Sequence, residues 1–248
     1  MTRRLWMADE VSGNRAALTG EHARHLSQVL RAQIGQEFHL SAGGEIRRAR
    51  ISKIDRSRVE FELGGLVPCA TVSAITVALS IFKFDRMEWA IEKSTELGVA
   101  RILPVISARS ERHLARSAAQ RVERWRRIAA EASEQSRRLS PPEIAAPMSL
   151  RDFLSLEAAT KIVLAEGEQE RMLEDALRKS GAPVILAFGP EGGWGEAELE
   201  AFRQSSWSAA SLGATILRAE TAVVAALAIA TAVLRQGHAD ADPSSPAD

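Results

Sequence analysis

The stretch that decides the fold is Val184-Ile-Leu-Ala-Phe-Gly-Pro-Glu-Gly-Gly-Trp-Gly195, in which an apolar strand runs into a loop with four glycines in seven residues. A helix is predicted to begin near Glu196. Glycine lets backbone groups approach a ligand closely, and ligands of parallel sheets bind at the carboxyl ends of the strands. Four glycines exceed what a sharp turn needs, so the loop is interpreted as a ligand site.

The ligand of this loop is not expected to be a nucleotide phosphate. The run lacks the Gly-Lys-Ser/Thr of a phosphate-cradling loop. Dinucleotide spacing counted from Gly193 would require glycine at position 198, where the chain has Glu198. Glu191 inside the loop would also repel a phosphate. An uncharged or cationic ligand fits better.

Strands and helices alternate on both sides of this stretch, which predicts a parallel sheet covered on both faces. Asp85 is predicted as the N-cap of the first helix and Gly98 as its end. The predicted strands are 75–81, 101–105, 162–164, 184–188 and 208–212, and the predicted helices are 85–97, 118–138, 172–179, 196–202 and 221–234.

The first 70 residues are predicted to be rich in β-strands, because apolar residues alternate along 46–54 and 59–63. Turns are expected at 42–44 and 55–57, and a short helix within 19–30. We therefore expect a first domain at 1–70, an α/β domain at 71–236, and a small, acidic, disordered tail at 237–248.

A second group of candidate site residues lies between Leu212 and Ala222, where Arg218 and Glu220 precede an apolar helix. An ion pair that caps the helix and a functional role for these charges both remain open. The helix at 221–234 has no polar face and must be buried on all sides. A subunit interface is favoured over the centre of a monomer.

The remaining sequence patterns give weaker evidence of a functional site. Glu131, Gln135 and Arg138 share one helical face, which is typical of a solvated, salt-bridged surface. His22 and His25 are three residues apart, but no further ligand lies nearby, so no metal site is expected. No Gly-x-Ser-x-Gly motif of a serine hydrolase occurs.

Composition bounds the class of protein. The chain has 248 residues, 46% of them hydrophobic, and one cysteine, which excludes an intrachain disulfide and a cysteine-rich zinc site. No signal peptide is visible, and the longest uncharged apolar run has 13 residues, short of the roughly 20 of a membrane helix. A soluble protein of the cytoplasm, without a membrane partner, is expected.

The net charge of zero hides an asymmetry. Residues 1–70 carry 11 basic and 8 acidic groups, residues 101–140 carry 10 and 4, and residues 151–248 carry 8 and 15. Of the 32 cations, 27 are arginine, whose planar fork suits phosphate. A polyanion bound by the first half and a set of solvated helix faces are both compatible with this pattern.

Together these fragments resemble the ribosomal RNA small subunit methyltransferase E family of the SPOUT class, over nearly the whole chain. The matching fragments occur in the family's order and are His25-Leu-Ser-Gln-Val-Leu-Arg31 with Gly35, Lys83, Met87-Glu88, Glu92-Lys-Ser-Thr-Glu-Leu-Gly-Val99, Pro104, Arg109-Ser110, Arg124-Trp125, Glu131-Ala-Ser-Glu-Gln135, Arg138, Gly189-Pro-Glu-Gly-Gly193, Leu212-Gly213, Ile216-Leu-Arg218 and Glu220-Thr-Ala222. The openings Arg3-Arg4-Leu5-Trp6 and Leu164-Ala165-Glu166 match less closely.

The resemblance implies a PUA-like β-barrel followed by an α/β domain with a trefoil knot. It implies methylation of N3 of a uridine in 16S ribosomal RNA with S-adenosylmethionine as donor, by a homodimer that acts on the RNA or the small ribosomal subunit. Two other readings stay open: a SPOUT enzyme for transfer RNA or a ribose 2′-hydroxyl, and a non-catalytic RNA-binding protein of ribosome assembly.

The resemblance also implies roles for particular residues. Arg218, Glu220 and Glu191 are candidates for the base or the charge stabiliser. Arg31, Arg109, Arg112, Gln135 and Arg138 are candidates for RNA contacts. The residues expected at the cofactor are Leu164, Ala165, Phe188, Gly189, Pro190, Gly192, Gly193, Leu212, Gly213, Ile216, Leu217 and Thr221.

Overall fold

The structure, a computed structural model, describes residues 5–67, 74–178 and 180–239, with side chains as far as Leu234. It divides into two compact units: Met1–Thr71 with Ala130–Pro141, and Val72–Ala129 with Pro142–Asp248. Cys69, the expected domain boundary at residue 70 and residues 240–248 of the expected tail lie outside the described residues. Residues 237–239, which were expected to belong to the disordered tail, instead belong to the helix Ala219–Ala239. The sequence pattern gave no sign that Ala130–Pro141 would join the first unit.

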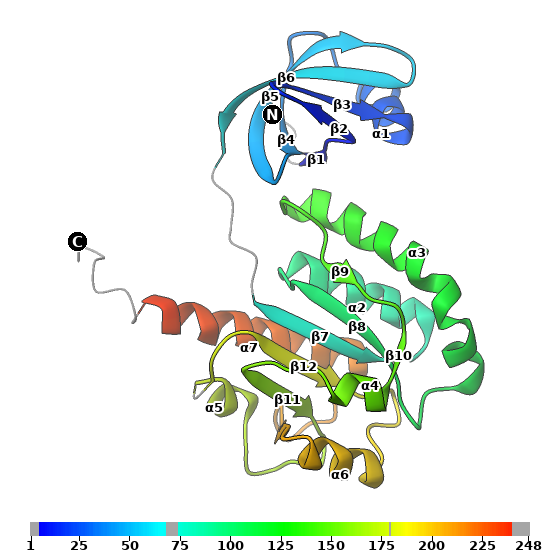
Figure 1. The fold of residues 1–248 in the computed structure, drawn as a ribbon, viewed down its shortest axis with the longest axis vertical. Helices are drawn as coiled ribbons and strands as arrows, with labels where there is room; N and C mark the ends of the chain where they lie inside the picture. The colour runs from blue at the N-terminus through cyan, green and yellow to red at the C-terminus, as the bar shows by residue number, and fades with distance from the viewer. Residues whose placement is uncertain (1–4, 68–73, 179, 240–248) are drawn as a thin grey trace. The chain divides into compact units, whose positions relative to one another are not determined.

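The first unit is built on a six-stranded sheet with the order β1-β4-β5-β6-β3-β2, antiparallel except where β1 pairs with β4 (Figure 1). The predicted alternation is confirmed, since Ala49, Ile51 and Phe61 are buried. The predicted short helix forms as α1 (Gly20–Arg24) and a π-helical turn (His25–Val29). The strands are β1 (Trp6–Met7), β2 (Glu10–Ser12), β3 (Arg15–Thr19), β4 (Glu37–Ala42), β5 (Glu45–Ile54) and β6 (Arg58–Leu66).

The second unit contains a seven-stranded sheet in which every pairing is parallel, as predicted. The strand order is β10-β8-β7-β12-β11-β13, and β9 pairs with β8. The strands are β7 (Ile75–Ser80), β8 (Arg101–Ile106), β9 (Glu143–Ile144), β10 (Met148–Ser149), β11 (Thr160–Leu164), β12 (Val184–Phe188) and β13 (Ser208–Ala210). The helices are α2 (Phe84–Glu96), α3 (Arg112–Ser136), α4 (Leu150–Leu154), α5 (Leu173–Arg178), α6 (Glu196–Gln204) and α7 (Ala219–Ala239).

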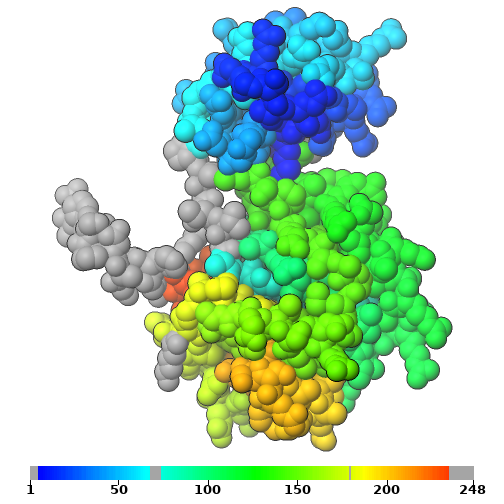
Figure 2. Space-filling model, in the orientation of Figure 1, coloured from blue at the N-terminus to red at the C-terminus, as the bar shows by residue number. Residues whose placement is uncertain are grey.

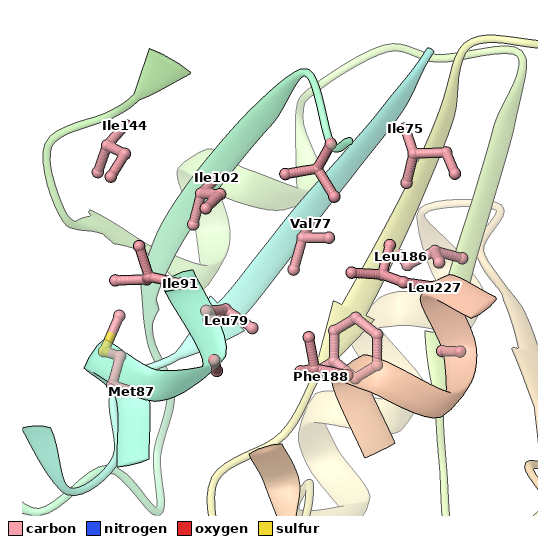
Figure 3. Packing of buried hydrophobic residues seen from close by; sticks show 14 of the residues in the cluster. Ile75, Val77, Leu79, Met87, Ile91, Ile102, Ile144, Leu186, Phe188 and Leu227 are labelled. Atoms are coloured by element: carbon pink, nitrogen blue, oxygen red, sulfur yellow. The ribbon is translucent and has the colours of Figure 1, made fainter. Parts of the chain in front are cut away.

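Helices cover both faces of this sheet because its strands are apolar on both sides. Val77 and Leu186 pack with residues of α2, α3, α5 and α7 on one face. Figure 3 shows both within this cluster, with Leu186 next to Leu227 of α7. The alternate residues of the same strands, such as Ala187, pack with α4 and α6 on the other face. The orange side chains of α6 lie at the surface of this unit in the space-filling view (Figure 2).

The start of α2 corrects one prediction. Asp85 was expected as the N-cap, but Lys83 is the N-cap and Asp85 lies in the first turn. The helix begins earlier because Phe82 is buried and Phe84 packs against the same apolar cluster, so the chain must turn between them. An acidic side chain in the first turn is still favourable for the helix dipole. The predicted end at Gly98 is confirmed by its φ of 91°.

Helix α7 is buried on one face only. Val223, Leu227 and Ala230 are fully buried, while Ala228 and Ala232 on another face are exposed. The expectation that this helix is buried on all sides is therefore not met within a single copy of the chain, and an apolar face stays uncovered. Among the described helices, none combines the length and apolar character that crossing a bilayer requires.

Candidate active site

A cavity of about 440 Å³ opens in the second unit, where β11, β12 and β13 end at their carboxyl sides. Three loops that follow these strands form most of its wall, and side chains of α2 and of the loop before α3 complete it. The lining residues are Arg86, Arg109, Leu164 to Gly167, Phe188 to Trp194, Leu199, Ala210 to Ala219 and Ala222. A site at this edge of the sheet is the place that the parallel topology favours for a ligand.

The loop between β12 and α6 needs its glycines for two reasons. The N–H of Gly193 donates to the carbonyl of Pro190 at 2.8 Å, and Gly193 has a φ of 65°, in the left-handed region. A Cβ on Gly189 would lie 3.3 Å from backbone atoms of Gly193 and Trp194. The loop therefore folds back closely on itself, and at Gly189 and Gly193 a side chain would disturb this path.

A buried carboxylate fixes this loop to its neighbour. Glu198, 7% exposed, accepts hydrogen bonds from the N–H of Ala108 at 2.7 Å and from the N–H of Gly195 at 2.9 Å. Arg109, next to Ala108, donates to the carbonyl of Gly192. The segment between β8 and α3 thus contacts both the middle of this loop and the first turn of α6.

The other two loops are joined through Ser211. Its N–H donates to the carbonyl of Arg171 and its carbonyl accepts from the N–H of Leu173, both at 2.9 Å. The N–H groups of Glu170 and Arg171 bond the Glu168 carboxylate and lower its pKa. The segment after β11 therefore has a defined path beside the segment after β13.

The loop between β13 and α7 exposes apolar surface to the cavity. Gly213 adopts a φ of 125°, and Ile216 is 80% exposed. A large apolar side chain with that exposure is suited to contact with a ligand ring, since burial of apolar area stabilises the complex. Leu212 and Leu217 line the same wall.

Charged side chains meet at one end of the cavity. The Arg86 guanidinium lies 3.7 Å from Glu191 (Nη1 to Oε1) and 3.8 Å from Glu220 (Nε to Oε1). The other carboxylate oxygen of Glu220 is buried without a hydrogen-bond partner in the described part of the chain. Arg86 is not among the site residues predicted from the sequence. Its place among family-like fragments, between Lys83 and Met87, was the available signal.

Eleven of the twelve residues expected at the cofactor line this cavity; the exception is Thr221, which is exposed on α7. Of the three catalytic candidates, Arg218 and Glu191 line it. Glu220 does not, although Arg86 connects it to Glu191. The structure thus brings together segments that lie more than 120 residues apart in the sequence.

The residues expected to contact RNA are divided between the two units. Arg109 lines the cavity, and Arg112 is exposed at the start of α3. Arg31, Gln135 and Arg138 belong to the first unit. Arg31 has a φ of 50°, which is uncommon for a residue with a side chain, and burial lowers the pKa of Arg138.

Within the described residues no group of three His, Cys, Asp or Glu side chains could hold a metal ion. His22 Nδ1 lies 3.5 Å from Asp9 and its Nε2 lies 3.4 Å from the buried carboxylate of Glu134, so its ring faces two carboxylates of the first unit.

Two family models match the chain. The model described as RNA methyltransferase domain covers residues 70–231, and the model described as RNA methyltransferase PUA domain covers residues 18–64. Ribosomal RNA small subunit methyltransferase E of Synechocystis is 32% identical over 94% of this chain and 78% of its own length. The protein of that name from Rickettsia conorii is 32% identical over 84% of this chain and 85% of its own length.

Solved structures similar to this chain are also methyltransferases. The small subunit methyltransferase E of Neisseria gonorrhoeae, bound to S-adenosyl methionine, superimposes with a TM-score of 0.83 at 32% identity, covering 93% of this chain and 97% of that one. A Legionella pneumophila methyltransferase in complex with the same cofactor has a TM-score of 0.80 at 27% identity, covering 92% and 96%.

A PUA-like unit joined to a parallel α/β unit, with a glycine-lined cavity at the strand ends, defines an RNA methyltransferase of the SPOUT class. At this level the fold class predicted from the sequence is confirmed. More particularly, the chain belongs to the ribosomal RNA small subunit methyltransferase E family.

Proposed function

We propose that this protein methylates N3 of a uridine in 16S ribosomal RNA, with S-adenosylmethionine as the methyl donor. The observation that carries the proposal is the cavity formed by the loops after β11, β12 and β13, in a chain of this family. The two relatives whose structures were compared hold the same donor.

The residues of the cavity fit such a donor. S-Adenosylmethionine carries no phosphate, and when bound it supplies a methyl group activated by a sulfonium cation. The wall includes the carboxylates of Glu166 and Glu191, which suit the sulfonium cation. It also includes the guanidiniums of Arg86, Arg109 and Arg218, which suit the carboxylate of the donor's methionine part. Gly192 and Gly193 line the cavity without a Cβ, so a ligand can approach their backbone closely. Leu212, Ile216 and Leu217 offer apolar contact to an adenine ring.

The chain's own residues must also handle a proton. N3 of uracil carries a hydrogen, so the N3–H bond breaks while the nitrogen electron pair forms the new bond to carbon. Glu191 and Glu220 are the carboxylates that can accept this proton, and Arg218 can stabilise the negative charge that develops on a uracil oxygen. Most of the acceleration is expected from holding the two reactants in line; effective molarities of about 10⁵ M or more are reached in this way.

The RNA must present an unpaired base, because N3 lies on the Watson–Crick edge. Arg109 and Arg112 of the second unit, and Arg31, Gln135 and Arg138 of the first, are the proposed RNA contacts. The excess of arginine in residues 1–70 and 101–140 favours a phosphate backbone as partner. The small ribosomal subunit, and hence the cytoplasm, is the proposed setting.

A homodimer and a trefoil knot in the second unit are part of the proposal. The uncovered apolar face of α7 supports a second copy of the chain as its partner. The backbone pairing of Ser211 with Arg171 and Leu173 supports a close approach of the segments after β11 and β13.

Mass-spectrometric mapping of methylated nucleosides in ribosomal RNA tests the proposal. RNA from cells with and without the protein is compared, and the purified protein is then added to small subunits that lack the modification. We expect one N3-methyluridine in 16S RNA that depends on the protein. A change confined to transfer RNA or to a ribose 2′-hydroxyl would favour another SPOUT activity, and no change together with absent donor binding would favour a non-catalytic assembly protein.

A further inference from the structure

Arg86 occupies the wall of the cavity although it comes from a separate element. It lies in the first turn of α2, lines the cavity and is 30% exposed at its side chain. Its guanidinium is within ion-pair distance of Glu191 and of Glu220, at 3.7 and 3.8 Å. Neither contact is short enough for a hydrogen bond, so both are charge contacts.

The two carboxylates come from different segments. Glu191 lies in the loop between β12 and α6, and Glu220 lies in the first turn of α7. Glu191 lines the cavity, whereas Glu220 is 14% exposed at its side chain and has one oxygen without a hydrogen-bond partner in the described chain. A single cation therefore connects a loop carboxylate that is 32% exposed to a helix carboxylate that is 14% exposed.

We propose that Arg86 is a positioning residue for methyl transfer, which holds the Glu191 carboxylate at the cavity while Glu220 fixes the guanidinium. The inference rests on the proposed function, because it assigns a role within the same site. In the transfer, the proton of N3 passes to the Glu191 carboxylate as the nitrogen pair takes the methyl carbon and the carbon–sulfur pair stays on sulfur.

The geometry explains why a cation is required at this point. Two carboxylates that share one guanidinium repel each other when that charge is removed, and Glu191, on an exposed loop, is free to turn toward solvent. Glu220 is anchored in a helix and cannot turn away as easily. Loss of Arg86 should therefore displace Glu191 and leave the rest of the cavity wall in place.

The first test compares Arg86→Ala and Arg86→Lys with the unmodified protein in single-turnover and steady-state methylation of small subunits. We expect Arg86→Ala to lower kcat about 100-fold, the loss typical of a displaced catalytic group, while KM for RNA and the calorimetric Kd for S-adenosylmethionine change less than threefold. Arg86→Lys, which keeps a charge at this position, should have a kcat at least tenfold higher than that of Arg86→Ala.

Arg178→Ala is the matched control, because Arg178 pairs with Glu174 on α5 and does not line the cavity. It should keep kcat within twofold. If Arg86→Ala instead raises the donor Kd and lowers the melting temperature without a separate loss in kcat, or if lysine gives no rescue, Arg86 is structural and the inference is wrong.

A second test asks whether Arg86 acts through Glu191. In a Glu191→Gln background, Arg86→Ala should lower kcat by less than a further threefold, because the carboxylate that Arg86 holds is already absent. If the kcat reductions of the two single variants multiply in the double variant, the two residues act independently and the inference is wrong. Failure of the proposed function is distinguishable, since the unmodified protein would then form no N3-methyluridine at all.

Discussion

At the scale of single residues, the site requires glycine at particular positions as well as particular side chains at others. A Cβ at Gly189 would press on the backbone of Gly193 and Trp194, and Gly193 has a left-handed φ. Arg218 and Ile216, by contrast, are exposed in the loop before α7 and line the cavity. Glycine backbone and exposed side chains thus both contribute to the cavity wall.

Gly193→Val should remove donor binding. A β-branched residue at a φ of 65° is strained by about 1–2 kcal/mol, and its side chain would grow toward Glu166 at the cavity wall. Isothermal titration with S-adenosylmethionine should show at least a tenfold weaker Kd. Gly65→Val is the control, because its Cβ would meet nothing within 4 Å, and affinity retained in the Gly193 variant would refute the loop assignment.

Arg218→Ala should abolish turnover and leave folding intact. No acidic partner is present for Arg218 in the described chain, so its removal breaks no ion pair, whereas it removes a cation from the cavity wall. A methylation assay together with a melting curve measures both effects. Unchanged activity would remove Arg218 from the mechanism.

At the scale of elements, the β12–α6 loop and helix α7 show how far the sequence pattern reaches. The apolar run of β12 followed by glycines predicted a strand, a ligand loop and a helix. The strand and the helix are present, and the loop between them lines the cavity. The pattern could not reveal that Glu198 reaches the N–H of Ala108, because that bond depends on a residue 90 positions away.

Glu198→Ala should destabilise the second unit. It removes the charged acceptor of two part-buried hydrogen bonds, from the N–H groups of Ala108 and Gly195, and a hydrogen bond to a charged group contributes about 1.5–3 kcal/mol. Denaturant unfolding should register a loss of this order. Glu196→Ala, at an exposed position of the same helix, should change stability by less than about 0.5 kcal/mol; equal losses in the two variants would contradict the role of Glu198.

Ala228→Arg should shift the protein from dimer to monomer. Ala228 is exposed on the uncovered apolar face of α7, and a charge there would be desolvated in an interface. Light scattering after size exclusion measures the mass. Ala119→Arg on α3 has a comparable exposed site and should stay dimeric; a monomeric unmodified protein would end the dimer proposal.

At the scale of the whole molecule, the fold class was predictable, because alternating strands and helices define a parallel sheet and because the family-like fragments span most of the chain. The assignment of Ala130–Pro141 to the first unit was not, since those residues continue a helix that begins in the second. Arg86 was missed for a similar reason: its role comes from contacts with Glu191 and Glu220, more than 100 residues further on.

The central claim is that backbone groups at the ends of β11, β12 and β13 hold the methyl donor in the cavity beside Glu191 and Arg218. A crystal structure of the protein grown with S-adenosylmethionine tests it most directly. We predict donor density within this cavity, with the adenine against the 212–217 loop and the sulfonium methyl directed to the end where Arg86 and Glu191 meet. Density elsewhere on the molecule, or none at saturating donor, would contradict the account.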